Sequence, residues 1–107
     1  MPRRKQVYKV TYPNGKIYVG MDLTGSLLYF GSPSAHEQIA ADLGLDPHRL
    51  DITLRKEILW ECETATDAEV RAKEMELIRE TRANDPAIGY NKLPRWVEAR
   101  KGENGIK

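Results

Sequence analysis

The sequence predicts a small α+β domain in which a three-stranded antiparallel sheet is flanked by helices, in the order β-β-α-β-α. Residues 7–12 and 17–20 alternate in the manner of strands on either side of a Pro-Asn-Gly turn, which is typical of a β-hairpin. Two capping boxes, Ser34-Ala35-His36-Glu37 and Thr66-Asp67-Ala68-Glu69, each mark the start of a helix. With 107 residues, of which 40% are hydrophobic, the chain has room for one modest core.

The hairpin turn decides which strand residues share a face. A two-residue loop would place Tyr8 and Tyr18 on opposite faces of the sheet. Residues 13–15 instead suit a type I turn followed by a left-handed glycine, which gives a three-residue loop with a bulge. That register pairs Val10 with Tyr18 and Tyr8 with Gly20, so Tyr8 and Tyr18 lie on one face as diagonal neighbours. The alternative for both tyrosines is ordinary packing of strand aromatics on a core.

The first helix and the third strand follow the hairpin. The helix is predicted to continue from the first capping box to Leu43, with Gly44 as its C-terminal cap. Residues 50–60 predict the third strand, because apolar and charged residues alternate there. One face of this strand is predicted to carry Ile52, Leu54, Ile58 and Trp60. The other is predicted to carry Arg55 and Glu57.

The second capping box opens a helix predicted to run from Asp67 to about Arg82. One stripe of this helix carries Val70, Leu77, Ile78 and Thr81, and Glu74 lies in the middle of the stripe. Burying an unpaired carboxylate is costly, so Glu74 must be paired, protonated or bound to a cation. A position at the rim of the helix face, paired with a lysine or arginine, is the alternative. Residues 93–97 predict a short final helix that ends near Gly102.

The charges of the chain are unevenly distributed. Residues 3–5 contribute +3, and residues 92–107 contribute five basic and two acidic groups, or +3, so residues 6–91 carry −5 to give the net charge of +1. Basic ends can hold a phosphate backbone while an acidic centre recruits a metal ion. The alternative is that terminal charges only aid solubility. The candidate nucleic-acid contacts are Arg3, Arg4, Lys5, Lys16, Lys92, Arg95, Arg100 and Lys101.

Cysteine usage and hydropathy bear on the compartment. The single Cys62 cannot form an internal disulfide and no set of zinc ligands is present, which is usual in a reducing compartment. No apolar segment approaches the length of a membrane span, and the basic N-terminus is not followed by the apolar region of a signal peptide. We therefore expect a cytoplasmic protein without a membrane partner.

The order of these features resembles that of the GIY-YIG nuclease superfamily over residues 6–92. The order is two tyrosine strands, a helix, a third strand, the Glu74 helix and finally Gly89-Tyr90-Asn91. The stretches 29–32, 56–59 and 85–91 are similar to its short stand-alone members, which are often borne by phages or mobile elements. The resemblance divides the chain into a basic N-terminal arm (1–5), a nuclease-like domain (6–92) and a basic C-terminal helix and tail (93–107).

The resemblance implies a metal-dependent endonuclease that hydrolyses DNA by in-line attack of water. Glu74 would bind one Mg²⁺ or Mn²⁺, and Tyr8 would be the general base or the partner of the base. Tyr18 would orient the water or the phosphate, and Asn91 would hold the site together by hydrogen bonds. The hydroxyls of Tyr8 and Tyr18 and the carboxylate of Glu74 should then line one concave surface. Two alternatives are a weakened or silent domain that only binds nucleic acid, and a protein-interaction module.

One feature departs from the family pattern. Family members usually carry an arginine on or just before the first helix that contacts the reacting phosphate, whereas residues 21–45 contain no arginine or lysine. The first motif also reads Val-Tyr-Lys in place of Gly-Ile-Tyr. The candidates for the phosphate contact are His36, Arg49 and Arg55. The missing arginine is also what a domain that only binds nucleic acid would show.

Overall fold

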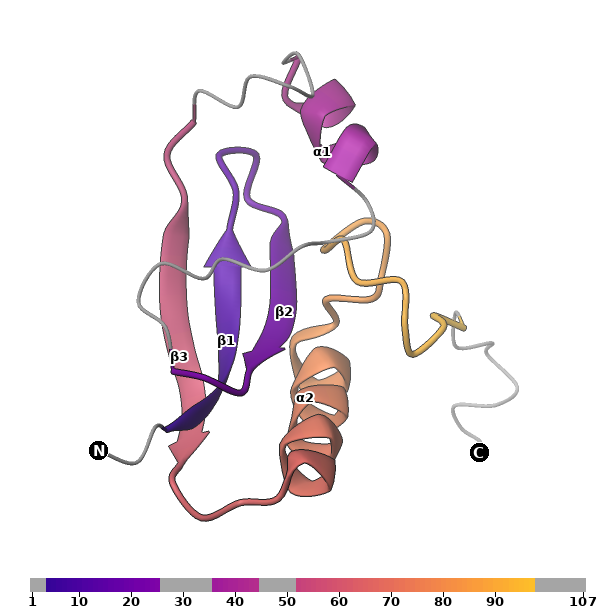
Figure 1. Ribbon diagram of the computed structural model, residues 1–107. Coiled ribbons are helices and arrows are strands. Elements are labelled where there is room, and N and C mark those ends of the chain that lie inside the picture. Colours follow the sequence, from indigo (N-terminus) through magenta and orange to yellow (C-terminus); the bar gives the residue numbers. More distant parts are fainter. Residues whose placement is uncertain (1–3, 26–35, 45–51, 98–107) are drawn as a thin grey trace.

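The computed structural model describes residues 4–25, 36–44 and 52–97 of the chain. Its elements follow the predicted order: β1 (Lys5–Thr11), β2 (Ile17–Asp22), α1 (His36–Asp42), β3 (Arg55–Cys62) and α2 (Asp67–Thr81). The strands form one antiparallel sheet in the order β2-β1-β3, with α2 beside β2 and α1 near the turn of the hairpin (Figure 1). The predicted α+β class with a three-stranded antiparallel sheet is therefore confirmed.

The β1–β2 hairpin has the three-residue loop that residues 13–15 predict. The backbone N–H of Gly15 donates to the carbonyl of Tyr12 at 2.8 Å, and Gly15 has a φ of +88°, in the left-handed region that favours glycine. Tyr8 pairs with Gly20, two residues after Tyr18. Because side chains alternate along a strand, Tyr8 and Tyr18 lie on the same face of the sheet, as predicted.

α2 starts and ends close to its predicted bounds. Its capping box is formed, because the N–H of Glu69 donates to Thr66 Oγ1 at 3.1 Å and the N–H of Thr66 donates to Glu69 Oε1 at 2.7 Å. Arg82 ends the helix in a left-handed conformation, with a φ of 62°. The helix packs on one face of the sheet, where the buried core residues are Val7, Val19, Ala65, Val70, Ile78 and Ala83.

The opposite face of the sheet carries a second buried cluster in which aromatic residues predominate: Tyr8, Val10, Tyr12, Ile39 and Tyr90. Ile39 comes from α1, which is followed by Gly44 in the left-handed conformation at a φ of +68°, as the predicted C-terminal cap requires. Part of the first predicted capping box, Ser34 and Ala35, lies outside the described residues. The packing alternative for the tyrosines therefore holds for Tyr8, whose side chain is part of this cluster, and in part for Tyr18, which is partly buried and packs against it.

β3 differs from the predicted third strand in its bounds and in its faces. It begins at Arg55, and residues 52–54 precede it without strand pairing. Val7 of β1 pairs with Trp60, whereas the next residue, Tyr8, pairs with Ile58. The extra residue between them forms a β-bulge, so Ile58 and Trp60 lie on opposite faces and the prediction that they share one is wrong. The alternation breaks at residues 58–60, which are all apolar, but such a run does not by itself distinguish a bulge from a strand buried on both faces.

The predicted helix at residues 93–97 is not formed, and 98–102 lie outside the described residues. The Leu93–Pro94 peptide bond is cis. The side chain of Asn84 donates from Nδ2 to the carbonyl of Pro94 at 2.7 Å, and the guanidinium of Arg82 lies 5.1 Å from the centre of the Trp96 ring. The segment thus packs back against the end of α2. A helix of this length would have few hydrogen bonds of its own to oppose these contacts.

The N-terminal residues that the structure describes are held against the domain. Lys5 is the first residue of β1, inside the segment predicted to be an arm, and its Nζ donates to Asp67 Oδ1 at 2.8 Å. Arg4 forms ion pairs with Glu61 at 3.1 Å and with Glu63 at 3.2 Å. The sheet therefore begins before residue 6, and residues 1–3 lie outside the described part of the chain.

Candidate active site

A pocket of about 290 Å³ lies where β2, α2 and the loop after α2 meet. Tyr18 lines it from β2, Glu74 from α2 and Asn91 from the loop, so three predicted site residues that are far apart in the sequence line one pocket. The predicted convergence of Tyr18 and Glu74 is therefore observed. The other lining residues are Arg71, Met75, Ile78, Tyr90, Lys92 and Leu93.

Tyr8 lies next to Tyr18 but beneath the surface, because its side chain is 0% exposed. A Cβ added to Gly20 would lie 2.6 Å from Tyr8 Oη and 3.0 Å from Cε2 of Tyr18. Glycine at this position thus leaves the space that the Tyr8 hydroxyl occupies. The ammonium of Lys56 lies 5.0 Å from the centre of the Tyr8 ring. The prediction that Tyr8, Tyr18 and Glu74 line one surface therefore holds for two of the three, since Tyr8 is drawn into the core.

Glu74 is half-buried in the wall of the pocket. Burial raises the pKa of its carboxyl above the ordinary value of 4.5, and the positive charge of Arg71, three residues earlier on α2, opposes part of that rise. Among the described residues no Lys, Arg or His comes within 4.0 Å of this carboxylate. A cation entering the pocket would therefore stabilise the charged form of Glu74.

Asn91 closes the outer edge of the sheet. Its Nδ2 donates to the carbonyl of Val19 at 2.7 Å, and its Oδ1 accepts from the N–H of Val19 at 2.8 Å. β2 is an edge strand, whose outward backbone groups need partners if they are not to stay open to other chains. The side chain of Asn91 supplies both partners. The predicted role of Asn91, to hold the site together by hydrogen bonds, agrees with this geometry.

The residues before Asn91 run along the same edge. The N–H of Ile17 donates to the carbonyl of Ile88 at 3.1 Å, and the N–H of Tyr90 donates to the carbonyl of Ile17 at 2.9 Å. A Cβ on Gly89 would collide with the backbone of Ala83 and would lie 2.7 Å from the carbonyl of Ile17. The structure thus explains Gly89-Tyr90-Asn91 in physical terms: glycine permits the close approach, and asparagine extends the pairing by its side chain.

Tyr90 ties α1 to the hairpin. Its hydroxyl donates to Asp42 Oδ2 at 2.7 Å and accepts from Asn14 Nδ2 at 2.9 Å. The hydrogen bonds from Tyr90 and Gln38, together with the charge of Lys16, lower the pKa of Asp42. Burial raises the pKa of Tyr90. Asp42 was not singled out from the sequence, because nothing in the local pattern indicates a partner 48 residues away.

Of the proposed substitutes for the missing arginine, Arg55 does not line the pocket. Arg55 is on β3, separated from β2 by β1, and its side chain is 74% exposed. Arg49 lies outside the described residues, and His36 is described only as the first residue of α1. The cations that do line the pocket are Arg71 and Lys92. The sequence analysis missed Arg71, although its position one helical turn before Glu74 was a signal that both share a helix face.

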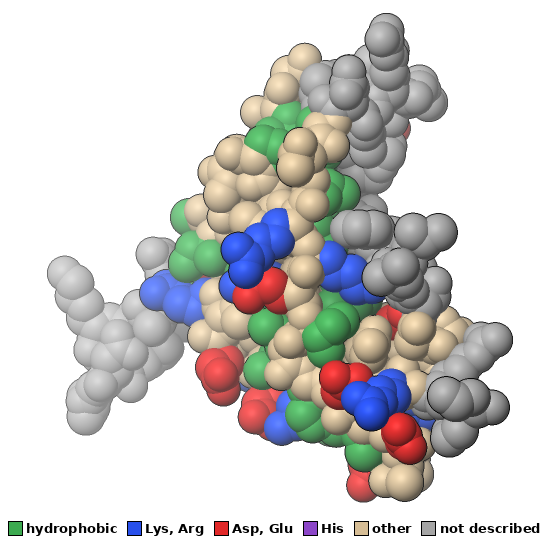
Figure 2. Space-filling view, turned by 90° about the vertical axis from the view of Figure 1, so that its left-hand side faces the viewer, with side chains coloured by type: hydrophobic (Ala, Val, Ile, Leu, Met, Phe, Trp, Pro, Cys, Tyr) green, Lys and Arg blue, Asp and Glu red, His purple; other side chains and the backbone are tan. Residues whose placement is uncertain are grey.

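The remaining candidate contacts for nucleic acid fall into two groups. Arg4 and Lys5 are paired with acidic side chains. Figure 2 shows a side of the molecule on which basic and acidic groups lie close together. Lys16, Lys92 and Arg95 instead line a second cavity of about 490 Å³. This cavity adjoins the Glu74 pocket, since Tyr90, Asn91 and Lys92 line both. Arg3, Arg100 and Lys101 lie outside the described residues.

Comparison of the chain with models of known families, with curated proteins and with solved structures finds no match. Within the described residues, no helix combines the length and the apolar character that crossing a bilayer requires. The same part of the chain holds no group of three or more His, Cys, Asp or Glu arranged to bind a metal ion. A metal site at this pocket would therefore rest on one carboxylate.

Proposed function

We propose that this protein is a metal-dependent endonuclease that hydrolyses DNA phosphodiester bonds with a GIY-YIG-like site. The observation that carries the proposal is the meeting of Tyr18, Glu74 and Asn91 in one pocket. These residues come from a strand, a helix and a loop, in the chain order that the resemblance requires. A protein-interaction module is less well supported, because it would give no reason for a tyrosine and a half-buried acid to meet beside Arg71 and Lys92, two cations without an ion pair to any other described residue.

The residues of the pocket fit one Mg²⁺ or Mn²⁺. Mg²⁺ keeps several of its waters and is often held by one or two carboxylates together with a phosphate. Glu74 offers such a carboxylate, half-buried and without an ion pair among the described residues. A divalent ion bound there supplies Lewis-acid stabilisation of charge on the reacting phosphate.

The protein's own side chains divide the remaining work. Tyr18 lines the pocket, and its hydroxyl would orient the attacking water by hydrogen bonding. Tyr8 is buried beside the Tyr18 ring, so we assign to it the role of partner of the base, and the phenolate form of Tyr18 would be the base that takes the proton of the water. Arg71 and Lys92 would hold the phosphate oxygens and balance the charge that develops on them. In this proposal Arg71 replaces the arginine that the family carries near its first helix, and His36 and Arg49 are the alternatives.

The test is the Glu74→Gln variant, which keeps the shape of the side chain and removes its charge. Wild type should cleave supercoiled, linear or single-stranded DNA only with Mg²⁺ or Mn²⁺, whereas Glu74→Gln should cleave none of them and still bind. Glu80→Gln is the matched control, because Glu80 is exposed on the same helix and lines neither cavity. Metal-dependent cleavage at the wild-type rate by Glu74→Gln would contradict the mechanism.

A domain that binds nucleic acid without cleaving it is the second candidate. The complete burial of Tyr8 favours it, because a buried hydroxyl has no access to an attacking water. In that case purified wild type would bind DNA but show no turnover with Mg²⁺ or Mn²⁺. Binding that is unchanged by either metal would support this candidate further.

A further inference from the structure

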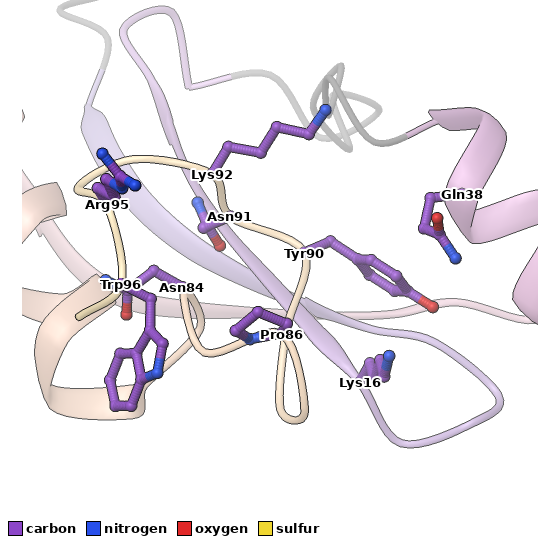
Figure 3. A pocket seen from close by; sticks show the side chains of 10 residues that line it. Lys16, Gln38, Asn84, Pro86, Tyr90, Asn91, Lys92, Arg95 and Trp96 are labelled. Atoms are coloured by element: carbon purple, nitrogen blue, oxygen red, sulfur yellow. The ribbon is translucent and has the colours of Figure 1, made fainter. Parts of the chain in front are cut away.

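The second cavity adjoins the Glu74 pocket and has a distinct chemical character. It lies between the hairpin, α1 and the chain after α2, and Figure 3 shows Tyr90 extending toward Gln38 at one end while Trp96 lies at the other. Its volume of about 490 Å³ is within the range of small-ligand sites. It therefore has room for a group as large as one nucleotide.

The walls of this cavity combine cations with aromatic rings. Lys16, Lys92 and Arg95 line it, and none of the described residues that line it is acidic. Lys16 forms an ion pair with Asp42, with 3.5 Å between Nζ and Oδ2. Lys92 and Arg95 form no ion pair with any described residue. Lys92 and Arg95 are thus available to an anion. Such walls match a ligand that is both anionic and flat.

The aromatic wall is held in place by the fold. Trp96 is half-buried, and the Arg82 guanidinium lies 5.1 Å from the centre of its ring. The backbone just before Trp96 is fixed by a hydrogen bond of 2.7 Å from Asn84 Nδ2 to the carbonyl of Pro94. The indole therefore does not depend on a ligand for its position, which reduces the entropic cost of stacking a base on it.

We propose that this cavity binds one unpaired nucleotide of the DNA strand whose reacting phosphate lies at Glu74, so that the protein prefers DNA with an unpaired base next to the cleaved bond. The second cavity and the Glu74 pocket share Tyr90, Asn91 and Lys92, so one DNA strand can occupy both. An unpaired base exposes its faces for stacking on aromatic side chains, whereas a base within a duplex already stacks on its neighbours. The placement of a reacting phosphate at Glu74 rests on the proposed function. The binding of an unpaired nucleotide in the second cavity does not depend on it.

Binding without cleavage provides the test. In the Glu74→Gln background, affinity is measured for three fluorescent DNAs: a paired duplex, the same duplex with one unpaired nucleotide, and a single strand. Trp96→Leu should weaken binding of the last two at least about fivefold and leave the duplex almost unchanged, because base stacking typically has an effect of this size or greater. Trp96→Phe should restore most of the affinity. Arg95→Ala should reduce by about one the number of counterions released on binding, as read from the slope of log affinity against log salt concentration. Arg79→Ala, at an exposed position on α2, should leave this slope unchanged.

The outcomes separate this inference from the nuclease proposal. If wild type never cleaves, yet Trp96→Leu loses the preference for an unpaired nucleotide, the nuclease proposal fails and the binding site stands. If wild type cleaves, but folded Trp96→Leu retains that preference, the site is overturned. Competition by poly-glutamate as effective as that by single-stranded DNA would also overturn it, since it would reveal a surface for acidic peptides. Thermal unfolding of each variant checks that it is folded.

Discussion

The two edges of the sheet use their charged residues differently. Along β3, Arg4 pairs with Glu61 and Glu63, and Lys9 Nζ lies 3.2 Å from Glu57 Oε1. Beside β2, Arg71, Lys92 and Arg95 line two cavities and form no ion pair with a described residue. Positive potential therefore remains on the β2 side, where the carboxylate of Glu74 also lies, and is largely neutralised on the other.

This contrast changes the meaning of the charge distribution along the chain. The sequence places basic residues at both ends of a net acidic centre, and the two ends look equivalent. In the structure, Arg4 and Lys5 at one end are tied to acidic side chains, whereas Lys92 and Arg95 at the other remain available. Partners, and not position in the sequence, decide which cations can meet a phosphate.

Among the changes that compare the two edges, the largest effect should come from removing Arg71, the cation of α2 that lines the Glu74 pocket. Arg71→Ala should lower cleavage about a hundredfold, because a positioned charge at a transferring phosphate contributes about 3 kcal/mol. Arg71→Lys should recover part of the rate, since it keeps the charge but not the planar fork. The measurement is kcat/KM with Mg²⁺, with Arg79→Ala as the control. An unchanged rate would transfer the role to His36 or Arg49, whose replacement by alanine should then cost as much.

The next effect concerns the closed edge of β2. Asn91→Ala removes both side-chain hydrogen bonds to Val19 and should destabilise the fold by about 2 kcal/mol, at about 1 kcal/mol for each bond. Urea unfolding measures the change. Lys92→Ala, at an exposed neighbouring position, should stay within about 0.5 kcal/mol. Equal effects of the two variants would mean that Asn91 does not hold the edge.

A smaller effect should appear as a dependence on pH. The pKa of Glu74 is raised in the folded protein, so between 4.5 and that raised value the folded state binds more protons than the unfolded state. The free energy of unfolding should therefore decrease as pH rises through this window, and cleavage should increase as the carboxylate becomes charged. In Glu74→Gln the decrease should be absent, so its stability advantage over wild type grows with pH. A parallel pH dependence in the two proteins would contradict the shift.

The smallest effect is expected on the β3 side. Arg4→Gln should alter stability by less than about 0.5 kcal/mol, because its ion pairs are exposed. It should also leave DNA affinity nearly unchanged, whereas Arg95→Gln should weaken binding and reduce its salt dependence. Fluorescence titrations at several salt concentrations compare the two. If both arginines had the same effect on DNA binding, the contrast between the edges would not hold.

Local signals in the sequence were sufficient for several elements. The turn at residues 13–15 predicts the hairpin register, because a left-handed glycine suits one loop length better than another. The capping box at Thr66 predicts the start of α2, because its hydrogen bonds join residues three apart. The stripe on that helix also indicates where Glu74 lies. These features depend on neighbours in the chain, so the sequence by itself determined them.

Other features depend on contacts between distant residues, and only the tertiary structure decided them. The bulge in β3 is set by its pairing with β1, and residues 93–97 follow their contacts with Arg82 and Asn84 instead of a helical tendency. The burial of Tyr8 depends on the space above Gly20. The pocket that unites Arg71 with Tyr18 and Asn91 forms only when β2, α2 and the following loop pack together. A pattern of neighbouring residues carries no information about contacts between distant residues. These parts of the site could therefore not be predicted from the sequence.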